Sequence, residues 1–417
     1  MSLSIGIVGL PNVGKSTLFN ALTDNKVLAA NYPFATIEPN TGIVPIPDPR
    51  LEKLAQIYSN PGVSRLDGVQ GAGEQRTEPY MKYGEGAAQP ETQQSIKSTS
   101  GAAGSARRQA GAAGMPRVIP ATVTFVDIAG LVAGASQGEG LGNQFLANIR
   151  SCNAICHVVR AFSDPNVQHV ETVPNPKKDI EVINTELVLA DLQTVENRLP
   201  RVEKEVKANP KLKPVLDSLH EIKLHLDDGK PVWTIEGLNH EAIADLQLLT
   251  VKPVIYVFNI DEATLAEALQ GATLKKELTD MVAPSKAVFI CAKLESELRG
   301  LDKADRSELL ESYGQKESGL VQLIHAAYGT LGLQSYLTAG EKEVRAWTIK
   351  KGSTAPQAAG VIHTDFERGF IAAQVVDYND LITAGSEQAA KSAGKIRTEG
   401  KTYIMQPDDV VEFRFNV

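Results

Sequence analysis

The feature that most constrains this chain is a glycine-rich segment at residues 9–17, which reads Gly-Leu-Pro-Asn-Val-Gly-Lys-Ser-Thr. It satisfies the spacing G-x-x-x-x-G-K-[S/T], in which backbone N–H groups turn inward around phosphate oxygens. The apolar run at residues 3–9 predicts a buried parallel strand before it, and a helix is predicted to begin at Lys15. A chance strand–turn–helix would have to reproduce both the spacing and this context. The segment therefore predicts a phosphate-binding loop.

Later apolar runs extend this first strand into a sheet. The segments between the runs are long enough for crossover helices, and the runs cover residues 121–126, 154–159, 253–259 and 287–291. Strands that alternate with helices in this way predict an α/β fold with a mostly parallel sheet. Together with the phosphate-binding loop, this pattern is typical of a P-loop nucleoside triphosphatase.

Three regions depart from this pattern. Residues 179–249 carry apolar side chains at helical spacing, which predicts a helical insert folded as an antiparallel hairpin. Residues 62–116 are rich in Gly, Ala, Gln and Ser, which predicts a disordered insertion. Short alternating segments from residue 334 onward predict a small, separate β-rich domain. The predicted division is 1–178 and 250–333 for the nucleotide-binding domain, 179–249 for the helical insert and 334–417 for the C-terminal domain.

Composition narrows the setting. The net charge of −8 over 417 residues argues against a protein that binds polyanions with its whole surface, although one domain could still carry a basic face. The three cysteines offer neither a disulfide framework nor a four-ligand zinc site. No secretory leader and no stretch able to span a bilayer is recognised. We therefore expect a cytoplasmic protein with no membrane partner.

The phosphate-binding loop supplies the first candidate site residues. Lys15 is predicted to reach the β and γ phosphates, and Ser16 to ligate Mg²⁺. Thr36, in the polar loop after the first helix, is predicted to complete the Mg²⁺ shell, although a loop threonine taken alone is more often a turn residue. The full set predicted to bind the phosphates is Asn12, Val13, Gly14, Lys15, Ser16 and Thr17.

A second motif ends the strand at residues 121–126. In Phe-Val-Asp-Ile-Ala-Gly, the Asp127 carboxylate is predicted to hold Mg²⁺ through water, while the Gly130 N–H meets the γ-phosphate. Leu131 follows where many GTPases place a glutamine that orients the attacking water, which predicts slow intrinsic hydrolysis. The catalytic candidates are therefore Lys15, Asp127, Gly130 and Leu131. The glycine-dense residues 134–142 suit a segment that reorders with the nucleotide state.

Base recognition is expected where Asn259-Ile-Asp-Glu262 stands in place of the GTPase pattern N-K-x-D. In a GTPase the aspartate accepts hydrogen bonds from the ring N–H and the exocyclic amine of guanine. Here Ile260 replaces the lysine, and Glu262, one methylene longer, replaces the aspartate, which weakens the basis for guanine selection. Adenine becomes credible. Cys291 and Ala292 are predicted to lie in the last loop that contacts the nucleotide.

Other polar residues favour ordinary structural roles. His157 lies in an apolar strand and is predicted to be a core histidine with satisfied hydrogen bonds. His363 and Asp365 are interpreted as turn and surface residues. The basic side chains of the helical insert could contact RNA, but a solvated helix face is the commoner explanation; they are Arg201, Lys204, Lys207, Lys211 and Lys213.

Taken together, these segments resemble the YchF family, also called Obg-like ATPases. The resemblance rests on residues 9–17, 31–40, 125–132, 138–143, 145–149 and 179–187. Residues 346–349 and 355–370 look like the TGS domain of that family, which is a β-grasp module. Nearly the whole chain is covered. The insertion at residues 62–116 is a departure from the family, whose members usually have a much shorter connection there.

The resemblance implies a G domain interrupted by a coiled-coil-like helical domain and followed by a TGS domain. It also implies that ATP is hydrolysed in preference to GTP and that the protein associates with ribosomes. By position, Ser16 and Thr36 would bind Mg²⁺, while Asn259, Ile260 and Glu262 would surround the base. Asn12 matches the position at which related enzymes hold K⁺, so stimulation by K⁺ is a hypothesis.

The first prediction for function is therefore an ATP-hydrolysing molecular switch. Two alternatives stay open from the sequence. One is a nucleotide-sensing RNA or ribosome adaptor in which turnover is incidental, and the other is a true GTPase. The oligomeric state is also left open.

Overall fold

The computed structural model describes residues 3–23, 40–59, 115–128, 141–163, 174–266 and 270–416. The strand before the phosphate-binding loop, β1 (Ser4–Val8), lies inside a six-stranded sheet of order β2-β4-β1-β5-β6-β7. The other strands are β2 (Thr41–Pro45), β4 (Thr122–Asp127), β5 (Ala154–Arg160), β6 (Val254–Asn259) and β7 (Lys286–Ile290). All neighbours pair in parallel except β2 with β4. The five strands predicted from apolar runs are confirmed, and the antiparallel edge strand β2 was not predicted.

Helices cover both faces of this sheet because successive side chains of each buried strand point to opposite sides. On one face, α1 (Lys15–Thr23) and α11 (Gly319–Thr330) pack against side chains such as Val158 and Val257. On the other face, Tyr256 and Phe258 lie in a buried cluster with α8 (Gln270–Val282) and with Ile180. α4 (Leu141–Ser151) buries Phe145, Leu146 and Ile149 in the main core. The short helices α7 (Glu262–Ala266), α9 (Ala292–Glu297) and α10 (Lys303–Ser312) follow β6 and β7.

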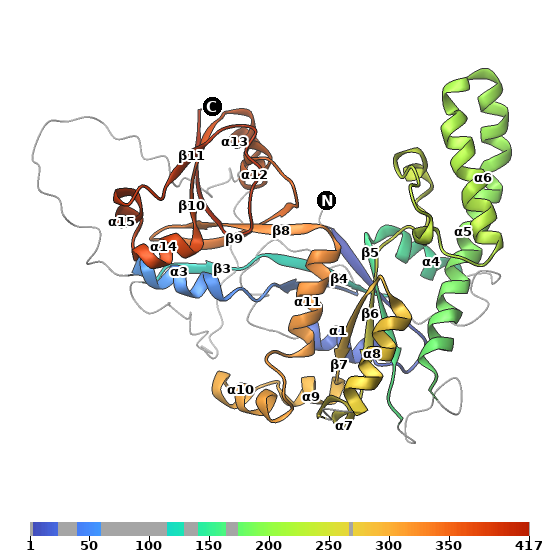
Figure 1. Ribbon diagram of the computed structural model, residues 1–417, viewed down its shortest axis with the longest axis horizontal. Helices are drawn as coiled ribbons and strands as arrows, with labels where there is room; N and C mark the ends of the chain where they lie inside the picture. Colours follow the sequence, from blue (N-terminus) through green and yellow to red (C-terminus); the bar gives the residue numbers. More distant parts are fainter. Residues whose placement is uncertain are drawn as a thin grey trace, which may run out of the picture.

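The predicted helical hairpin is confirmed. Helix α5 (Pro176–Ala208) and α6 (Lys213–Asp227) run antiparallel and project away from the sheet (Figure 1), and the one-turn helix η1 (Pro210–Leu212) joins them. Val188, Val195 and Val202 share a buried cluster with apolar side chains of α6. The turns η2 (Val232–Thr234) and η3 (Glu241–Leu246) complete the region. The start of α5 packs in the sheet's own core, so the helix spans the predicted boundary at residue 179.

A second six-stranded sheet forms the C-terminal part, in the order β11-β10-β12-β8-β9-β3. Helix α12 (Ala355–Ile362) packs against it, and the Tyr336 hydroxyl donates to the Ala358 carbonyl oxygen at 2.9 Å. Three further helices are α13 (Thr364–Arg368), α14 (Tyr378–Ala384) and α15 (Glu387–Ser392). The strands are β8 (Leu333–Ala339), β9 (Glu343–Lys350), β10 (Phe370–Asp377), β11 (Arg397–Glu399), β12 (Asp409–Phe415) and β3 (Arg117–Ile119).

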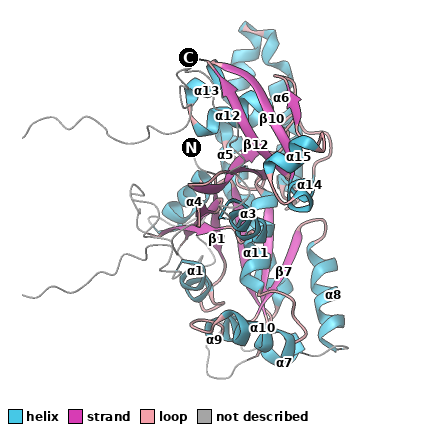
Figure 2. Cartoon of the chain, turned by 90° about the vertical axis from the view of Figure 1, so that its left-hand side faces the viewer, coloured by secondary structure: helices cyan, strands magenta, loops and turns pink. Residues whose placement is uncertain are grey.

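The expectation that this β-rich region is separate needs correction. Strand β3 comes from the first part of the chain, pairs in parallel with β9 and leads directly into β4. Helix α3 (Pro49–Ser59) packs against β3, β9 and α14 (Figure 1, Figure 2). Its Arg50 donates to the Pro407 carbonyl oxygen at 2.7 Å and to Asp408 Oδ1 at 2.8 Å. Apolar side chains of both sheets, such as Val44 and Val344, form one continuous core with Leu51 of α3.

No helix in the described part of the chain is both long and apolar enough to cross a membrane. Most of the predicted insertion at residues 62–116 lies outside the described residues, which resume at Met115.

Candidate nucleotide-binding site

Backbone conformation defines the phosphate-binding loop. Three of its residues have positive φ angles: Gly9 at 155°, Asn12 at 61° and Gly14 at 101°. A Cβ atom added to Gly14 would lie 2.7 Å from Asn259 Nδ2, and one added to Gly9 would lie 2.5 Å from the Val158 carbonyl oxygen. Both positions therefore require glycine for conformation and for space. The loop is a tight turn that ends at the N-terminus of α1, where N–H groups without helical partners favour anions.

Lys15 is the first residue of α1 and is almost fully buried, with 8% of its surface exposed. Its Nζ donates to the Leu10 carbonyl oxygen at 2.6 Å, so the ammonium lies over the loop. Burial lowers the pKa of Lys15 to about 8, against the opposing attraction of Asp127. Burial raises the pKa of the Asp127 carboxyl, and the charge of Lys15 opposes that rise. Asp127 ends β4 next to β1, so the structure brings these two predicted catalytic residues together.

The remaining loop residues divide by exposure. Val13 is buried and anchors the loop in the core, while Ser16 and Thr17 are exposed on the first turn of α1. An exposed hydroxyl at the end of the loop, on the helix that also presents Lys15, is available as a metal ligand. The described residues contain no group of three or more His, Cys, Asp or Glu that could hold a metal ion. Mg²⁺ bound to a nucleotide needs few protein ligands because phosphates and waters supply the others, so the residues fit this ion.

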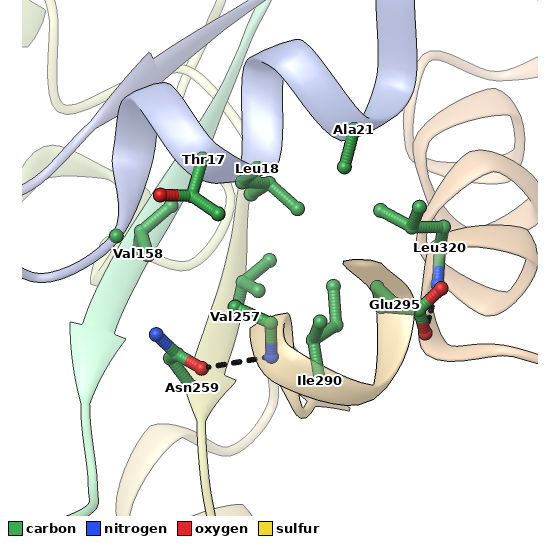
Figure 3. A pocket seen from close by; sticks show the side chains of 11 residues that line it. Thr17, Leu18, Ala21, Val158, Val257, Asn259, Ile290, Glu295 and Leu320 are labelled. Carbon is green, nitrogen blue, oxygen red and sulfur yellow. Dashed lines mark hydrogen bonds between the residues drawn. The ribbon is translucent and has the colours of Figure 1, made fainter. Parts of the chain in front are cut away.

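Asn259 connects the phosphate-binding loop to the predicted base loop. It is 7% exposed at the end of β6, and its Nδ2 donates to the Val13 carbonyl oxygen at 3.2 Å. Its Oδ1 accepts a hydrogen bond from the Ala292 N–H at 3.3 Å, at the start of α9 (Figure 3). Both polar atoms of the amide are therefore used inside the protein. This side chain therefore connects the phosphate-binding loop, at Val13, with the predicted base-binding loop, at Ala292.

Ile260 and Cys291 occupy the core. Ile260 is 2% exposed and Cys291 is 3% exposed, and both belong to the apolar cluster that contains Phe258 and Leu294. The Ile260 N–H donates to the Ile290 carbonyl oxygen at 2.9 Å, which ties the two loops together. With their side chains enclosed in this way, contacts of Ile260 and Cys291 with a base would come from their backbone atoms.

Glu262 opens α7 and is partly exposed. Its carboxylate is held by Lys293, whose Nζ lies 2.9 Å from both Oε1 and Oε2. Asp261 Oδ1 accepts from the Thr264 N–H at 2.7 Å, which fixes the start of the same helix. Lys293 ends the run at residues 290–293 that was predicted to be the last loop contacting the nucleotide, but its pairing with Glu262 was not predicted, because the pair joins two loops that are far apart in the sequence.

A small cavity lies behind the loop, between α1, β6, β7, α9 and α11 (Figure 3). Its walls are mainly apolar, and two of its polar side chains are paired: Asn259 with Ala292, and Glu295 Oε1 with the Leu320 N–H at 3.3 Å. Burial raises the pKa of Glu295, which caps α11 together with Ser318. The cavity is therefore mainly a gap in the packing beneath α1, with the Thr17 hydroxyl as its remaining polar side-chain group.

Two histidine predictions have different outcomes. His157 is buried as predicted, but among the described residues its Nε2 has no hydrogen-bond partner, so the prediction of a satisfied histidine is wrong. Burial lowers its pKa to about 3, with a smaller contribution from Lys15. The ring packs against Tyr256, with ring centroids 5.3 Å apart. His363 caps α13 by accepting from the Asp365 N–H at 3.2 Å, in agreement with a turn role.

Thr36, Gly130 and Leu131 lie outside the described residues, as do most of residues 134–142. Their predicted roles therefore stay predictions.

Comparison with known proteins places this arrangement in a family. A family model described as "50S ribosome-binding GTPase" matches residues 4–191, and the YchF-GTPase C-terminal model, described as "Protein of unknown function (DUF933)", matches residues 333–416.

Full-length relatives agree with these models. The protein named "Ribosome-binding ATPase YchF" from Bacillus subtilis (strain 168) is 44% identical over 422 residues, with 100% of each chain covered. "Obg-like ATPase 1" from Pongo abelii is 38% identical over 423 residues, covering 100% of this chain and 93% of the relative. The solved structure of the Schizosaccharomyces pombe YchF GTPase matches with a TM-score of 0.76 and 33% identity, covering 99% of this chain and 98% of that chain. The chain therefore belongs to the YchF family of P-loop nucleoside triphosphatases.

Proposed function

We propose that this protein is a ribosome-associated molecular switch that binds and hydrolyses Mg-ATP in preference to Mg-GTP. The observation that carries the proposal is the bridge made by Asn259, which joins the phosphate-binding loop to a base loop that ends in Glu262 rather than aspartate. The names of the full-length relatives, "Ribosome-binding ATPase YchF", support both the nucleotide and the partner.

Hydrolysis would depend on positioning and electrostatics. The N-terminus of α1 and the buried Lys15 present positive charge to the phosphates, and a low-polarity site makes that charge more effective. Ser16 and Thr36 would hold Mg²⁺, which neutralises charge on the phosphate oxygens when bound. Leu131 has no group that can orient water, so we expect low turnover by the protein alone.

A monovalent ion is part of the proposal. Asn12 has a left-handed backbone conformation at the outer edge of the phosphate-binding loop, where its side chain would hold K⁺ near the phosphates. ATP turnover measured in K⁺ should exceed turnover in Na⁺ at the same ionic strength. Equal rates in the two salts would show that K⁺ does not stimulate hydrolysis.

Ribosome contact is proposed through the helical hairpin and the C-terminal sheet. Lys204, Lys207 and Lys211 are exposed on α5 and the following turn, whereas Arg201 and Lys213 pair with Glu205 and Asp217. Exposed lysines on a projecting hairpin could reach phosphates of RNA.

The test is ATP turnover with and without purified 70S ribosomes. The switch proposal predicts a large rise in turnover when ribosomes are added. Ribosome binding that leaves turnover unchanged would favour the alternative of an adaptor whose hydrolysis is incidental. A triple variant in which Lys204, Lys207 and Lys211 are replaced by glutamine should lose much of the stimulation and keep its basal rate, because none of these residues lies near the nucleotide site.

A further inference from the structure

Strands β6 and β7 end at equivalent places at one edge of the nucleotide-binding sheet, and a loop follows each of them. Strands β6 and β7 are parallel neighbours in which Asn259 pairs with Ile290. Glu262 lies three residues beyond Asn259, and Lys293 lies three residues beyond Ile290. The pairing of the strands therefore sets these two side chains opposite each other.

The contact between them is symmetric. Lys293 Nζ lies 2.9 Å from Oε2 of Glu262 and 2.9 Å from its Oε1. The hydrogen bond with Glu262 raises the pKa of Lys293, so the lysine is charged at neutral pH. Both acceptor oxygens of the carboxylate are consequently engaged by one ammonium group.

A guanine base needs both of these oxygens. Its ring N–H and exocyclic amine are two adjacent donors, and a carboxylate recognises them by accepting one hydrogen bond on each oxygen. Adenine lacks the ring N–H donor and makes no such demand. A guanine nucleotide entering this site would therefore compete with Lys293 for these two oxygens, and a nucleotide with adenine would not.

We propose that Lys293 is a specificity-determining residue that disfavours guanine nucleotides by occupying both carboxylate oxygens of Glu262. This inference rests on the proposed preference for ATP and adds the residue that contributes to it. The lysine side chain is 68% exposed and Glu262 is 30% exposed, so the pair is solvated and its effect is modest. Exposed pairs of this kind support a change of about threefold to fivefold in relative affinity.

The experiment is displacement of a fluorescent ATP analogue by unlabelled ATP and by GTP in Mg²⁺, with the full-length protein. The Lys293→Met variant should bind GTP about threefold to fivefold more tightly, with ATP affinity changed little. Lys293→Arg keeps a cation opposite Glu262 and should retain the wild-type ratio. Lys401→Met removes an exposed lysine in the C-terminal region and serves as the matched control.

The outcomes separate this inference from the proposed function. If wild type prefers ATP and Lys293→Met leaves the ratio of ATP to GTP affinity unchanged, or changes both affinities equally, the role of Lys293 is wrong while the ATP preference stands. If wild type prefers GTP, the proposed function and the inference both fail. Thermal unfolding of each variant checks that a changed ratio does not come from partial unfolding.

Discussion

At the phosphate end of the site, the loop at residues 9–17 is one continuous segment, and its shape is set by the backbone of Gly9, Asn12 and Gly14. At the base end, two loops from different strands meet, and side chains hold them: Asn259 bridges to Ala292, and Lys293 pairs with Glu262. A loop whose shape is set by its backbone conformation accepts few other structures. Loops held together by side-chain contacts can change their preference among nucleotides through a single substitution. Substitutions at the phosphate end should therefore affect all nucleotides, and substitutions at the base end should affect their ratio.

The largest effect is expected at the phosphate end. Lys15→Met removes the buried cation and should lower turnover of ATP by about 100-fold to 1,000-fold, as the loss of a preorganised charge does in other enzymes. Any GTP turnover should fall by a similar factor, because Lys15 is predicted to contact the phosphates and not the base. Steady-state phosphate release checks this, with Lys401→Met as the control. A large change in the ratio of the two rates would contradict the separation of the two ends.

Asn259 tests the junction between the two ends. Asn259→Ala leaves the Val13 carbonyl and the Ala292 N–H without their partner, which should weaken binding of both nucleotides by about 10-fold to 100-fold. Asn259→Asp keeps an acceptor for Ala292 but places an oxygen against the Val13 carbonyl, so it should recover only part of the affinity. Titration with fluorescent nucleotides measures both. Wild-type affinity in the alanine variant would show that the bridge is unnecessary.

His157 tests whether the scaffold under the phosphate end is closed to water. Its pKa is lowered by burial to about 3, from an ordinary value of 6.5, so only the unfolded chain takes up a proton as the pH falls below 6.5. The contribution of His157 to the free energy of unfolding is therefore full above pH 6.5 and is lost progressively as the pH falls below 6.5. Between pH 7.5 and pH 5, protonation of His157 in the unfolded chain should lower the free energy of unfolding by about 2 kcal/mol.

The measurement compares urea unfolding of wild type and His157→Leu over this pH range. Between pH 7.5 and pH 5, the free energy of unfolding of the variant should fall by about 2 kcal/mol less than that of wild type. Equal acid sensitivity of the two proteins would mean that the histidine titrates in the folded state.

A smaller effect concerns the pH dependence of binding. Lys15 has a pKa of about 8 in the nucleotide-free protein, and phosphates bound beside it favour its charged form. Affinity for ATP should therefore be nearly full at pH 7 and below, and should fall by about tenfold between pH 7 and pH 9. Isothermal titration across this range checks the prediction. Lys15→Met should bind weakly with no such fall, and an equally steep fall in that variant would assign the effect to another group.

The same contrast explains what the sequence could predict. The phosphate-binding loop, its flanking strand and Lys15 form a local pattern, and the apolar runs of the parallel strands are equally local. Pairings between distant segments could not be predicted. Arg117 of β3 lies opposite Glu343 of β9, and Lys293 pairs with Glu262. In each pair, the residues around one partner contain no pattern that indicates which distant segment it contacts. For His157, the apolar pattern indicated burial but gave no information about a hydrogen-bond partner.

The central claim, that the base end favours adenine, is tested most directly by measuring ATP and GTP affinities of the wild-type protein beside a Glu262→Asp variant. Wild type should bind ATP more tightly than GTP, and the ratio of affinities should shift toward GTP in the variant, whose carboxylate matches the GTPase pattern. Tighter binding of GTP by wild type would contradict the claim, and the protein would then have to be treated as a GTPase switch.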